Sequence, residues 1–336
     1  MRTCRNCNAE GFSETAGFCT KCGSRLELAH FVAIDVETAN ADLSSICQVG
    51  VASFRDGVLY DSWKSLVNPE DYFDPFHVSI HGIDEDVVRT APTWASVYAE
   101  VASLIRGNIV VCHTAFDRVA LARACEKNTL AQCECQWLDS ARVVRRAWPK
   151  FSGSGYRLAN VAAELGIKYE PHDALEDARC AGEILLQAID ETGLTTGEWL
   201  RRVEQQINLP TAQPAIESKS PDELAERAKR PRQPAAALPI SRHGNSDGAF
   251  YGEVLVFTGA LSMPRREAAD GAAAAGCEVA TSVSHRTTLL VVGDEDIRKL
   301  AGHEKSTKHR KAEELIAGGQ NIRILGESDF QRMLSH

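Results

Sequence analysis

Acidic side chains and a histidine stand at intervals that suit metal-dependent hydrolysis. Asp35 and Glu37 end the apolar run FVAIDVE, and the alternation of a strand places residues two apart on one face. Two like charges held so close are costly unless a cation lies between them. Asp117 follows the apolar run IVVCH, and His172 and Asp177 lie in EPHDALEDARCAG. Neither the Asp-x-Glu pair, which arises by chance, nor Asp117, which a helix dipole alone would favour, is decisive singly.

The stretch EPHDALEDARCAG determines how His172 can reach Asp177. Residues five apart on one helix lie about 140° from each other, so these two side chains cannot share a helix face. They converge only if His172 precedes the helix. Asp173 is a good N-cap, and Glu176, three residues later, completes a capping box. We therefore assign Asp173 and Glu176 to capping rather than to metal, and we expect His172 on the preceding loop.

Strand-like and helical patterns alternate over the region that carries these residues. We expect strands at 31–36, 46–54, 58–67 and 109–113, and helices at 93–105, 116–126, 158–166 and 174–189. Asp56 and Gly57 form a hairpin turn between the second and third strands. Strands followed by strand–helix alternation indicate an α/β fold with a mixed sheet.

The rest of the chain changes character twice. Residues 205–248 are rich in Pro, Ala, Ser and charge without periodicity, which predicts a flexible linker. Beyond them we expect strands at 253–259, 287–294 and 322–325, and helices at 263–276, 306–319 and 327–334. The expected organisation is a cysteine-rich segment (1–28), an α/β domain (29–195), a flexible linker (196–248) and a second α/β domain (249–336).

Composition restricts the class of protein. With 336 residues, 44% of them hydrophobic and 25% charged, the chain is long enough for two or three globular modules. No apolar run reaches about 18 residues, and the N-terminus lacks the apolar region of a signal peptide. We therefore expect no membrane association and a cytoplasmic location. Eleven cysteines without a secretory signal fit the same reducing compartment.

Charge is unevenly distributed along the chain. Residues 29–195 hold 14 Lys and Arg against 24 Asp and Glu, whereas residues 196–336 hold 19 of each. An acidic domain is a poor landing surface for nucleic acid unless several of its carboxylates hold divalent cations. Charge alone therefore does not identify a substrate.

The N-terminal segment carries two Cys-x2-Cys pairs, Cys4 with Cys7 and Cys19 with Cys22. Four thiolates form the tetrahedral set that a structural Zn²⁺ prefers. A polar segment of this length has no other means to fold. The pattern resembles a short zinc ribbon that holds one Zn²⁺, and both nucleic acid and protein remain open as its ligand.

Three motifs together resemble those of the DEDD exonuclease family in its histidine-bearing form: DVETAN (35–40), HTAFD (113–117) and HDALEDA (172–178). That family includes bacterial proofreading exonuclease subunits, ribonuclease T and oligoribonuclease. The resemblance extends over about residues 30–190 and implies a ribonuclease H-like mixed sheet with flanking helices. Thr114 stands where the family often has an Asn that supports the substrate, so we expect catalysis to be retained and the substrate contact to differ.

The resemblance implies that Asp35, Glu37, Asp117 and Asp177 hold two Mg²⁺ or Mn²⁺ ions and that His172 is the general base. Oxygen ligands suit such hard cations. Two ions about 3.5–4 Å apart can activate water and stabilise the leaving 3′ oxygen, and a neutral histidine can accept the proton. The implied activity is 3′→5′ exonucleolytic release of nucleoside 5′-monophosphates from a nucleic acid with a free 3′ end, single-stranded or frayed.

The C-terminal domain resembles a BRCT domain, most closely those of NAD-dependent DNA ligases and of the clamp-loader large subunit. The resemblance rests on VFTGAL (256–261), TTLLVVGD (287–294) and STKHRKAEEL (306–315) and implies the element order βαββαβα. Phe330 stands where many BRCT domains carry a late tryptophan. Such a domain would bind a 5′-phosphate end or a repair or replication protein.

In the phosphate-binding members of that family, a Thr-Gly after the first strand and a Lys on the second helix meet one phosphate. The corresponding residues are Thr258, Gly259 and Lys308, with Arg265 or Arg266 nearby. Hydroxyl, backbone N–H and ammonium donors can converge on one oxyanion. The alternative is a solvated basic helix.

Three functions fit these features. The first is a DNA-processing exonuclease in replication or repair, which the ligase-type BRCT resemblance favours. The second is an RNA-trimming exonuclease, since the same active site serves RNA in ribonuclease T and oligoribonuclease. The third is a scaffold whose BRCT and zinc-ribbon contacts matter more than a minor nuclease activity.

Overall fold

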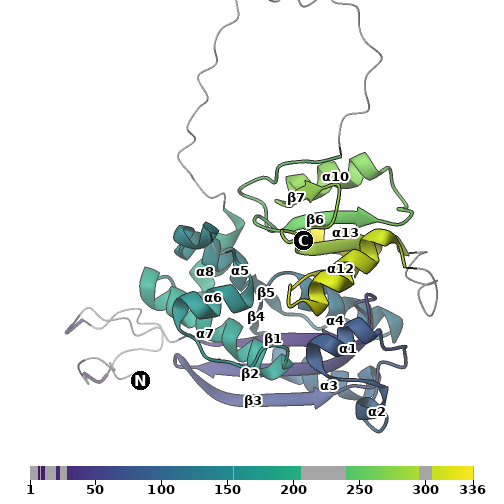
Figure 1. The fold of residues 1–336 in the computed structure, drawn as a ribbon. Helices are drawn as coiled ribbons and strands as arrows, with labels where there is room; N and C mark the ends of the chain where they lie inside the picture. Colours follow the sequence, from purple (N-terminus) through teal and green to yellow (C-terminus); the bar gives the residue numbers. More distant parts are fainter. Residues whose placement is uncertain are drawn as a thin grey trace, which may run out of the picture.

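The computed structural model describes Cys7 and residues 9–11, 20–22, 29–153, 155–205, 240–294 and 305–335. Cys4 and Cys19 lie outside the described residues, so the expected zinc ribbon stays a prediction. In the part of the chain that is described, no helix has the length and apolarity needed to cross a membrane. Two α/β units are described, the first unit (residues 29–205) and the second unit (residues 240–335) (Figure 1).

The first unit is built on a five-stranded mixed sheet with the strand order β3-β2-β1-β4-β5. The strands are β1 (Phe31–Thr38), β2 (Ile46–Arg55), β3 (Val58–Leu66), β4 (Ile109–Cys112) and β5 (Gln136–Asp139). β2 is antiparallel to β1 and β3, whereas β4 is parallel to β1 and β5. The predicted hairpin turn is confirmed, with φ of 58° at Asp56 and 74° at Gly57.

Helices cover both faces of this sheet. One face packs on α3 (Trp94–Ile105) and α4 (Phe116–Lys127). The other packs on four helices, α5 (Ser140–Ala147), α6 (Leu158–Leu165), α7 (Ala174–Thr192) and α8 (Thr196–Glu204). Short turns of helix, α1 (Pro75–His81), α2 (Glu85–Val88) and η1 (Pro149–Gly153), lie in the connections.

Alternation along β1 sets the direction of its acidic residues. Val32, Ile34 and Val36 point into the core that α3 and α4 cover, while Phe31 and Ala33 point into the opposite core with α7. Asp35 and Glu37 follow the register of Phe31 and Ala33. Both carboxylates are therefore directed to the α7 side of the sheet.

The expected linker boundaries were wrong at both ends. Residues 196–204 form α8, which begins with a capping box between Thr195 and Glu198 and buries Trp199 and Val203. At the other end, Arg242 forms a bridge with Val279 of the second unit. The Pro- and Ala-rich composition begins only beyond this helix, and two buried apolar residues four apart are a periodic signal too short to mark the helix in the sequence. Residues 206–239 lie outside the described residues.

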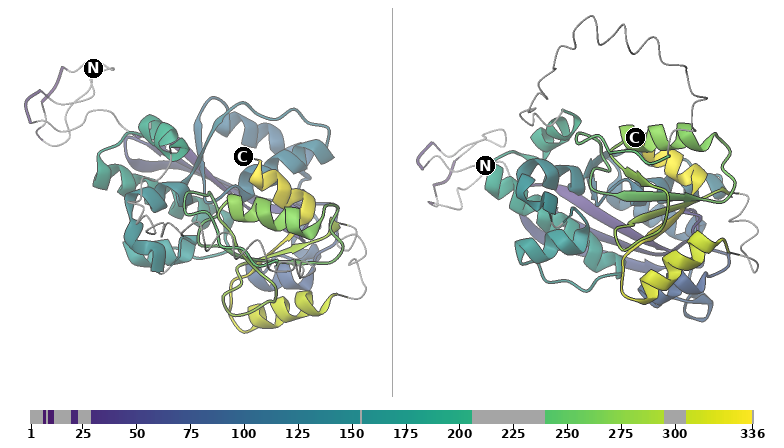
Figure 2. Two further views of the ribbon diagram at one scale, coloured as in Figure 1. Left: turned by 90° about the horizontal axis from the view of Figure 1, so that it is seen from above. Right: turned by 45° about the horizontal axis from the view of Figure 1, so that its top comes forward.

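The second unit has a four-stranded parallel sheet with the order β7-β6-β8-β9. Its elements follow in sequence as β6 (Val254–Thr258), α10 (Arg265–Ala274), β7 (Glu278–Ala280), β8 (Leu289–Val292), α12 (Thr307–Ala317), β9 (Arg323–Gly326) and α13 (Glu327–Leu334). Two further views show these elements lying against one side of the first unit (Figure 2).

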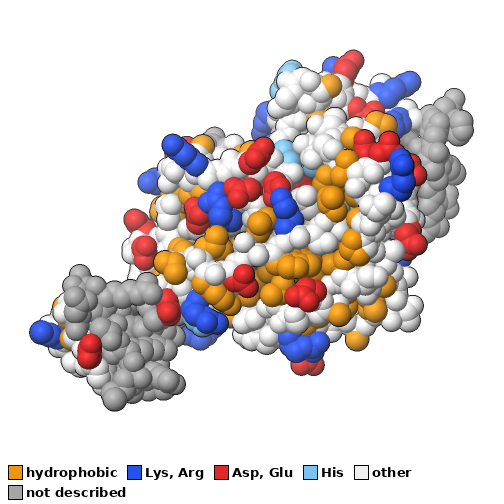
Figure 3. Space-filling view, turned by 90° about the horizontal axis from the view of Figure 1, so that it is seen from below, with side chains coloured by type: hydrophobic (Ala, Val, Ile, Leu, Met, Phe, Trp, Pro, Cys, Tyr) orange, Lys and Arg blue, Asp and Glu red, His pale blue; other side chains and the backbone are white. Residues whose placement is uncertain are grey.

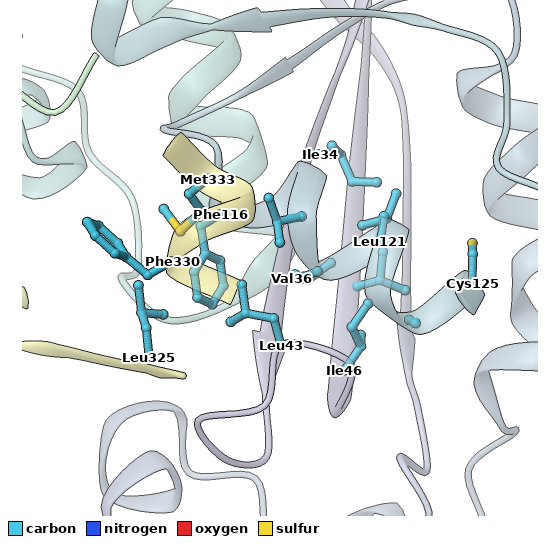
Figure 4. Packing of buried hydrophobic residues seen from close by; sticks show 14 of the residues in the cluster. Ile34, Val36, Leu43, Ile46, Phe116, Leu121, Cys125, Leu325, Phe330 and Met333 are labelled. Carbon is cyan, nitrogen blue, oxygen red and sulfur yellow. The ribbon is translucent and has the colours of Figure 1, made fainter. Parts of the chain in front are cut away.

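The two units share one hydrophobic core. Phe330 and Met333 of α13 lie beside Phe116 of α4 and Leu43 of the first unit (Figure 4). Phe330, at the position of the tryptophan expected in many BRCT domains, is buried and lies 6.1 Å from Phe257, ring centroid to ring centroid. The apolar packing continues across the boundary, so the second unit is held as part of the same packed body.

A buried carboxylate fixes the orientation of α13 on the first unit. One Asp329 oxygen accepts a hydrogen bond from Arg123 Nε at 2.6 Å, and the other accepts one from the backbone N–H of Leu43 at 2.9 Å. Asp329 is 1% exposed. A second ion pair joins Arg332 to Glu126 at 2.7 Å. Buried polar groups with satisfied hydrogen bonds specify one docking geometry.

The opposite edge of the first unit is formed by β3, which exposes Val58, Leu59 and Tyr60. Seen from below, this side of the molecule carries apolar side chains across its middle, with acidic and basic side chains interspersed (Figure 3). Mixed charge of this kind gives no single-sign field of the sort that attracts a polyanion.

Candidate active site

Asp117 contacts β1 beyond the point where β1 and β4 stop pairing. β4 pairs with β1 at Val32 and Ala33, and the edge of β1 beyond them meets the first turn of α4 instead. Asp117 Oδ1 accepts a hydrogen bond from the backbone N–H of Val36 at 3.1 Å. The side chain of Asp117, 2% exposed, is thus anchored between the two acidic residues of β1.

His172 and Asp177 converge as the helix start predicted. Asp173 is the N-cap of α7, and its side chain accepts hydrogen bonds from the N–H groups of Leu175 and Glu176. His172 lies before the helix with a φ of 67°, and its backbone N–H donates to Asp177 Oδ2 at 2.9 Å. The ligand atoms of Glu37, His172 and Asp177 all lie within 4.8 Å of one another.

One detail of that helix start was predicted wrongly. The Glu176 carboxylate does not return to the N-cap backbone to close a capping box. It instead accepts a hydrogen bond from Arg179 at 2.6 Å, one turn further along α7. A charge-assisted pair to an arginine is stronger than a second bond to a backbone N–H that water can reach.

Two residues of β2 that the motifs did not identify position α7 over the acidic pair. Gly50 lies opposite Asp35 in the strand register, and a Cβ at Gly50 would come within 2.2 Å of the backbone nitrogen of Leu175. Gln48 Oε1 accepts a hydrogen bond from the N–H of Ala174 at 2.8 Å. A glycine inside a strand indicates close backbone approach, and this signal could have been used.

Burial and mutual repulsion make the four carboxyls hard to ionise together. Burial, with a contribution from the charge of Asp177, raises the pKa of Glu37 to about 8. Burial raises the pKa of Asp117 and that of Asp177 to about 7. The pKa of Asp35 is raised well above its ordinary value, by burial first and then by Asp117. Clustered acids of this kind are stabilised by positive charge, so this all-oxygen donor set fits hard divalent cations.

The two histidines of the motifs have different surroundings. His172 lies at the mouth of the site with its side chain open to solvent, and partial desolvation of its ring by the surrounding walls, followed by the charge of Arg323, lowers its pKa. His113 is buried, with Nδ1 2.8 Å from Ser140 Oγ and Nε2 2.8 Å from the carbonyl oxygen of Tyr156. Its ring therefore holds the second motif in place, while His172 has a ring free to take a proton.

A cavity of about 170 Å³ lies between the two units and is lined by residues of both. From the first unit, Asp35, Glu37, His172 and Asp177 line it. From the second unit it is lined by Glu253, Thr288, Leu289, Asn321, Ile322, Arg323 and Ile324. The second unit therefore forms one wall of the cavity that holds the acidic residues, a contact that the sequence did not predict.

A second group with metal-ligand spacing joins the two units at Asp74, His309 and Glu313. The ammonium of Lys305 contacts Glu313 and lies 3.5 Å from Asp74 Oδ1. A cation of the chain itself thus neutralises this group, which is most simply part of the contact between the units.

The residues predicted to bind phosphate gather at the carboxyl end of β6. Lys308 Nζ and Arg265 Nη1 donate to the carbonyl oxygen of Phe257, at 3.0 Å and 2.9 Å. The Thr258 hydroxyl is buried and lies 2.7 Å from Ser306 Oγ. Burial and the neighbouring Arg265 lower the pKa of Lys308. Of the two candidate arginines, Arg265 is the one that the described contacts place beside Lys308.

Arg265 also donates a hydrogen bond to the residue that follows the strand. Its Nη2 donates to the carbonyl oxygen of Gly259 at 2.5 Å, and Gly259 has a φ of 74°. The predicted residues are therefore neighbours in space, and their donors are at present directed to backbone oxygens.

Comparison with known proteins agrees with both units. Residues 32–185 match the family model described as Exonuclease (RNase T), and residues 245–332 match the BRCA1 C Terminus (BRCT) domain. Over 183 residues the chain is 27% identical to the 3′-5′ exonuclease DinG of Bacillus subtilis, covering 52% of this chain and 19% of DinG. It is 25% identical over 164 residues to a PolC-type DNA polymerase III of Caldanaerobacter subterraneus subsp. tengcongensis, covering 48% and 12%.

The chain thus spans no more than a fifth of the length of either curated relative. Among solved structures, Exonuclease X in complex with 5′ overhanging duplex DNA is 21% identical, with a TM-score of 0.42, covering 51% of this chain and 98% of that one. The first unit is therefore a 3′→5′ exonuclease domain of the histidine-bearing (DEDDh) RNase T type, and the second unit is a BRCT domain.

Proposed function

We propose that this protein hydrolyses DNA from a free 3′ end and releases nucleoside 5′-monophosphates. The observation that carries the proposal is that Asp35, Glu37, Asp177 and His172 line one cavity, with the buried Asp117 bonded to the backbone between Asp35 and Glu37. The described ion pairs include none with Asp35, Glu37, Asp117 or Asp177. The charges of neighbouring carboxylates raise the pKa values of Asp35 and Glu37. The charge of Arg323 acts on all four without pairing with any of them, and one cation does not balance four carboxylates, so the cluster is suited to binding external cations.

Asp35, Glu37, Asp117 and Asp177 would hold two Mg²⁺ or Mn²⁺ ions. When bound, such ions supply water activation and stabilisation of the leaving 3′ oxygen. The rest of the reaction falls to the chain. The water oxygen forms a bond to phosphorus, the bond from phosphorus to the 3′ oxygen breaks, and the neutral ring of His172 takes the proton from the water, while the leaving 3′ oxygen takes up a proton from solvent.

The lowered pKa of His172 suits this role, because the ring is then neutral at physiological pH and available as a base. The backbone N–H of His172 is held by Asp177, so the base is positioned by a carboxylate of the same site. Both are placed by the start of α7, which couples the base to the metal ligands.

We infer that the polymer is DNA from the domain packed against the exonuclease domain and from the name of one relative. A BRCT domain is packed against it, and one relative is named as a DNA polymerase. The direct test uses matched 5′-labelled single-stranded DNA and RNA oligonucleotides with the full chain and Mg²⁺. We expect a ladder shortened from the 3′ end, formed faster on DNA. Faster cleavage of RNA would favour an RNA-trimming enzyme instead, and no cleavage of either would contradict the proposed exonuclease function.

We also propose that Thr258, Gly259 and Lys308, with Arg265, bind a phosphate such as that of a 5′ end. Support comes from two cationic side chains meeting at the end of β6 beside the start of α12. Full-length protein should bind a 5′-phosphorylated oligonucleotide more tightly than its 5′-hydroxyl counterpart. Lys308→Ala should abolish that difference, while Lys311→Ala, on the same helix and exposed, should retain it. Equal affinity for both ends would refute the assignment and leave the BRCT domain a protein-interaction module.

For the N-terminal segment we propose one structural Zn²⁺ held by Cys4, Cys7, Cys19 and Cys22. The support is the spacing of the two cysteine pairs. Metal analysis of the purified full chain should find one zinc per chain, and Cys22→Ser should lose it. Purified protein without zinc, in which all four thiols react freely, would contradict the proposal.

A further inference from the structure

The BRCT domain faces the catalytic cavity with one particular edge. Glu253 precedes β6, Thr288 and Leu289 stand at the start of β8, and Arg323 is the first residue of β9. These are the amino ends of parallel strands. The predicted phosphate-binding residues gather at the opposite, carboxyl end of β6. The cavity wall and the predicted phosphate site are therefore separate features of one sheet.

Arg323 is the cation that this edge presents to the exonuclease motifs. It is exposed, and its guanidinium carbon lies 4.1 Å from the centre of the Phe116 ring. Its Nη1 lies 3.4 Å from the hydroxyl of Thr114, a residue of the second motif held at a φ of 79°. The planar guanidinium is thus positioned by stacking on the exonuclease domain.

The charge of Arg323 is not committed to an ion pair. Among the described residues, no carboxylate lies within ion-pair distance of it. Arg323 nevertheless lines the same cavity as Asp35, Glu37 and Asp177. If it served only as their counter-ion, it would be expected to pair with one of them. With divalent cations on the carboxylates, the anion left for this guanidinium is a phosphate of the nucleic acid.

The position of Arg323 is fixed by the docking of the BRCT domain. Asp329, six residues later, is buried and bonded to Arg123 and to the backbone of Leu43. Between them, the N–H of Gly326 donates to the carbonyl oxygen of Ala41 at 3.2 Å. These contacts, together with the shared apolar core, make this wall a permanent part of the cavity rather than a lid.

We propose that the BRCT domain completes the substrate cleft of the exonuclease and that Arg323 binds a phosphate of the DNA strand near its 3′ end. The proposal rests on the proposed exonuclease function. It also accounts for Thr114, because a bonded guanidinium above the second motif takes over the substrate contact that the family often assigns to an Asn there. A cleft with walls from two domains admits a single strand, so duplex ends would have to fray before cleavage.

The kinetic test compares full-length Arg323→Ala with the full-length wild-type protein on a single-stranded DNA oligonucleotide. We expect kcat/KM to fall about tenfold or more, mainly through KM, because a charge-assisted contact to phosphate is lost. Arg323→Lys, which keeps the charge without the planar fork, should fall between the two. Arg55→Ala removes the same charge at the β2–β3 hairpin, away from the cavity, and should match the wild type.

The binding test does not depend on turnover. With Asp177→Asn in every protein to prevent cleavage, fluorescence anisotropy of a labelled single strand measures affinity at several salt concentrations. Arg323→Ala should weaken binding and reduce the slope of log affinity against log salt by about 0.7, the value for one single-strand phosphate contact. Thermal melting of each variant checks the fold, and Arg323→Gln replaces any variant that fails it.

Each result separates the proposals. If Arg323→Ala raises the activity, Arg323 is an inhibitory plug and the proposal is wrong. If activity, affinity and salt slope are unchanged, Arg323 does not contact the strand. If the wild type cleaves neither DNA nor RNA, the proposed exonuclease function fails, while the salt slope still reports on Arg323.

Discussion

The acidic cluster of the exonuclease domain and the basic cluster at the end of β6 differ in how far other groups of the chain bond to their charged side chains. Asp35, Glu37, Asp117 and Asp177 crowd together without an ion pair among the described residues, and burial first, with repulsion from neighbouring carboxylates, raises their pKa values. The cations at the end of β6 donate instead to backbone oxygens. The acidic cluster therefore requires added charge to function, whereas the basic cluster is stable without a ligand. A binding role follows more strongly for the first than for the second.

The largest expected effect is on the acidic cluster. Asp177→Asn removes the charge of a proposed metal ligand and leaves a neutral amide oxygen, a weaker acceptor, for the N–H of His172. Activity should fall by well over the roughly 10- to 100-fold that loss of an outer-shell partner costs. Initial rates on single-stranded DNA measure this, with circular dichroism as the control for folding. Activity within tenfold of the wild type would contradict the assignment of Asp177.

The same substitution should stabilise the metal-free protein, which sharpens the contrast. The pKa of Asp177 is about 7 when folded, against about 3.9 when unfolded. Folding therefore binds a proton between these values, and the stability it contributes is lost as pH rises from about 4 through 7. In EDTA at pH 8, Asp177→Asn should gain roughly 1–3 kcal/mol in urea denaturation, and less at pH 5. Equal stability of both proteins at pH 8 would mean that the cluster is not strained.

A smaller effect is expected where the backbone positions the cluster. Gly50→Ala would place a Cβ within 2.2 Å of α7, so the helix must move away from Asp35. We expect a loss of about 1–3 kcal/mol in stability and a fall in kcat, since a shift of about 1 Å in a reacting group can cost 10²-fold. Gly197→Ala in α8, where a Cβ meets open space and φ is not positive, is the comparison for a glycine change without a clash. If Gly50→Ala kept full activity, α7 would not need this close approach.

Weakening the contact that holds the BRCT domain on the exonuclease domain should have a still smaller effect on the rate of hydrolysis. Asp329→Ala leaves Arg123 and the N–H of Leu43 without their shared acceptor. We expect KM for single-stranded DNA to rise as it does in Arg323→Ala, and the two changes together to be less than additive, because both act through one contact. A double-mutant cycle on kcat/KM measures this. Full additivity would show that docking and Arg323 act independently.

The smallest effect is expected at the basic cluster. Lys308→Ala should leave hydrolysis of a 5′-hydroxyl strand unchanged and alter stability by about 0.5 kcal/mol or less. Rates on matched 5′-phosphate and 5′-hydroxyl strands check it. A large loss on both strands would mean that Lys308 takes part in forming the catalytic cleft.

The sequence predicted the site wherever the geometry is local. Strand alternation placed Asp35 and Glu37 together, and the N-cap at Asp173 correctly separated His172 from the helix. The capping box failed because Arg179 offered Glu176 a stronger partner. The helix at 196–204 was missed because its two buried apolar residues are too short a periodic signal. Local patterns thus predict how the candidate catalytic residues are brought together, but not every bond that supports them.

The rest of the site depends on contacts between residues far apart in the chain. Arg323 reaches Thr114 across 209 positions, and no local pattern indicates such a contact. Gly50 indicates a close backbone approach without indicating which element approaches, and the role of Gln48 follows only from the packing of α7 on the strand. The four-residue strand β5 is too short for a periodic signal. These features arise from packing, so the fold was needed to find them.

We propose that the acidic cluster cleaves DNA from the 3′ end and that this cleavage depends on divalent cations. Full-length protein and a 5′-labelled single strand, first in EDTA and then with excess Mg²⁺ or Mn²⁺, test it most directly. We expect no cleavage in EDTA, and on adding the metal a ladder that shortens one nucleotide at a time from the 3′ end. Undiminished cleavage in EDTA, or internal cuts in place of a ladder, would contradict the account.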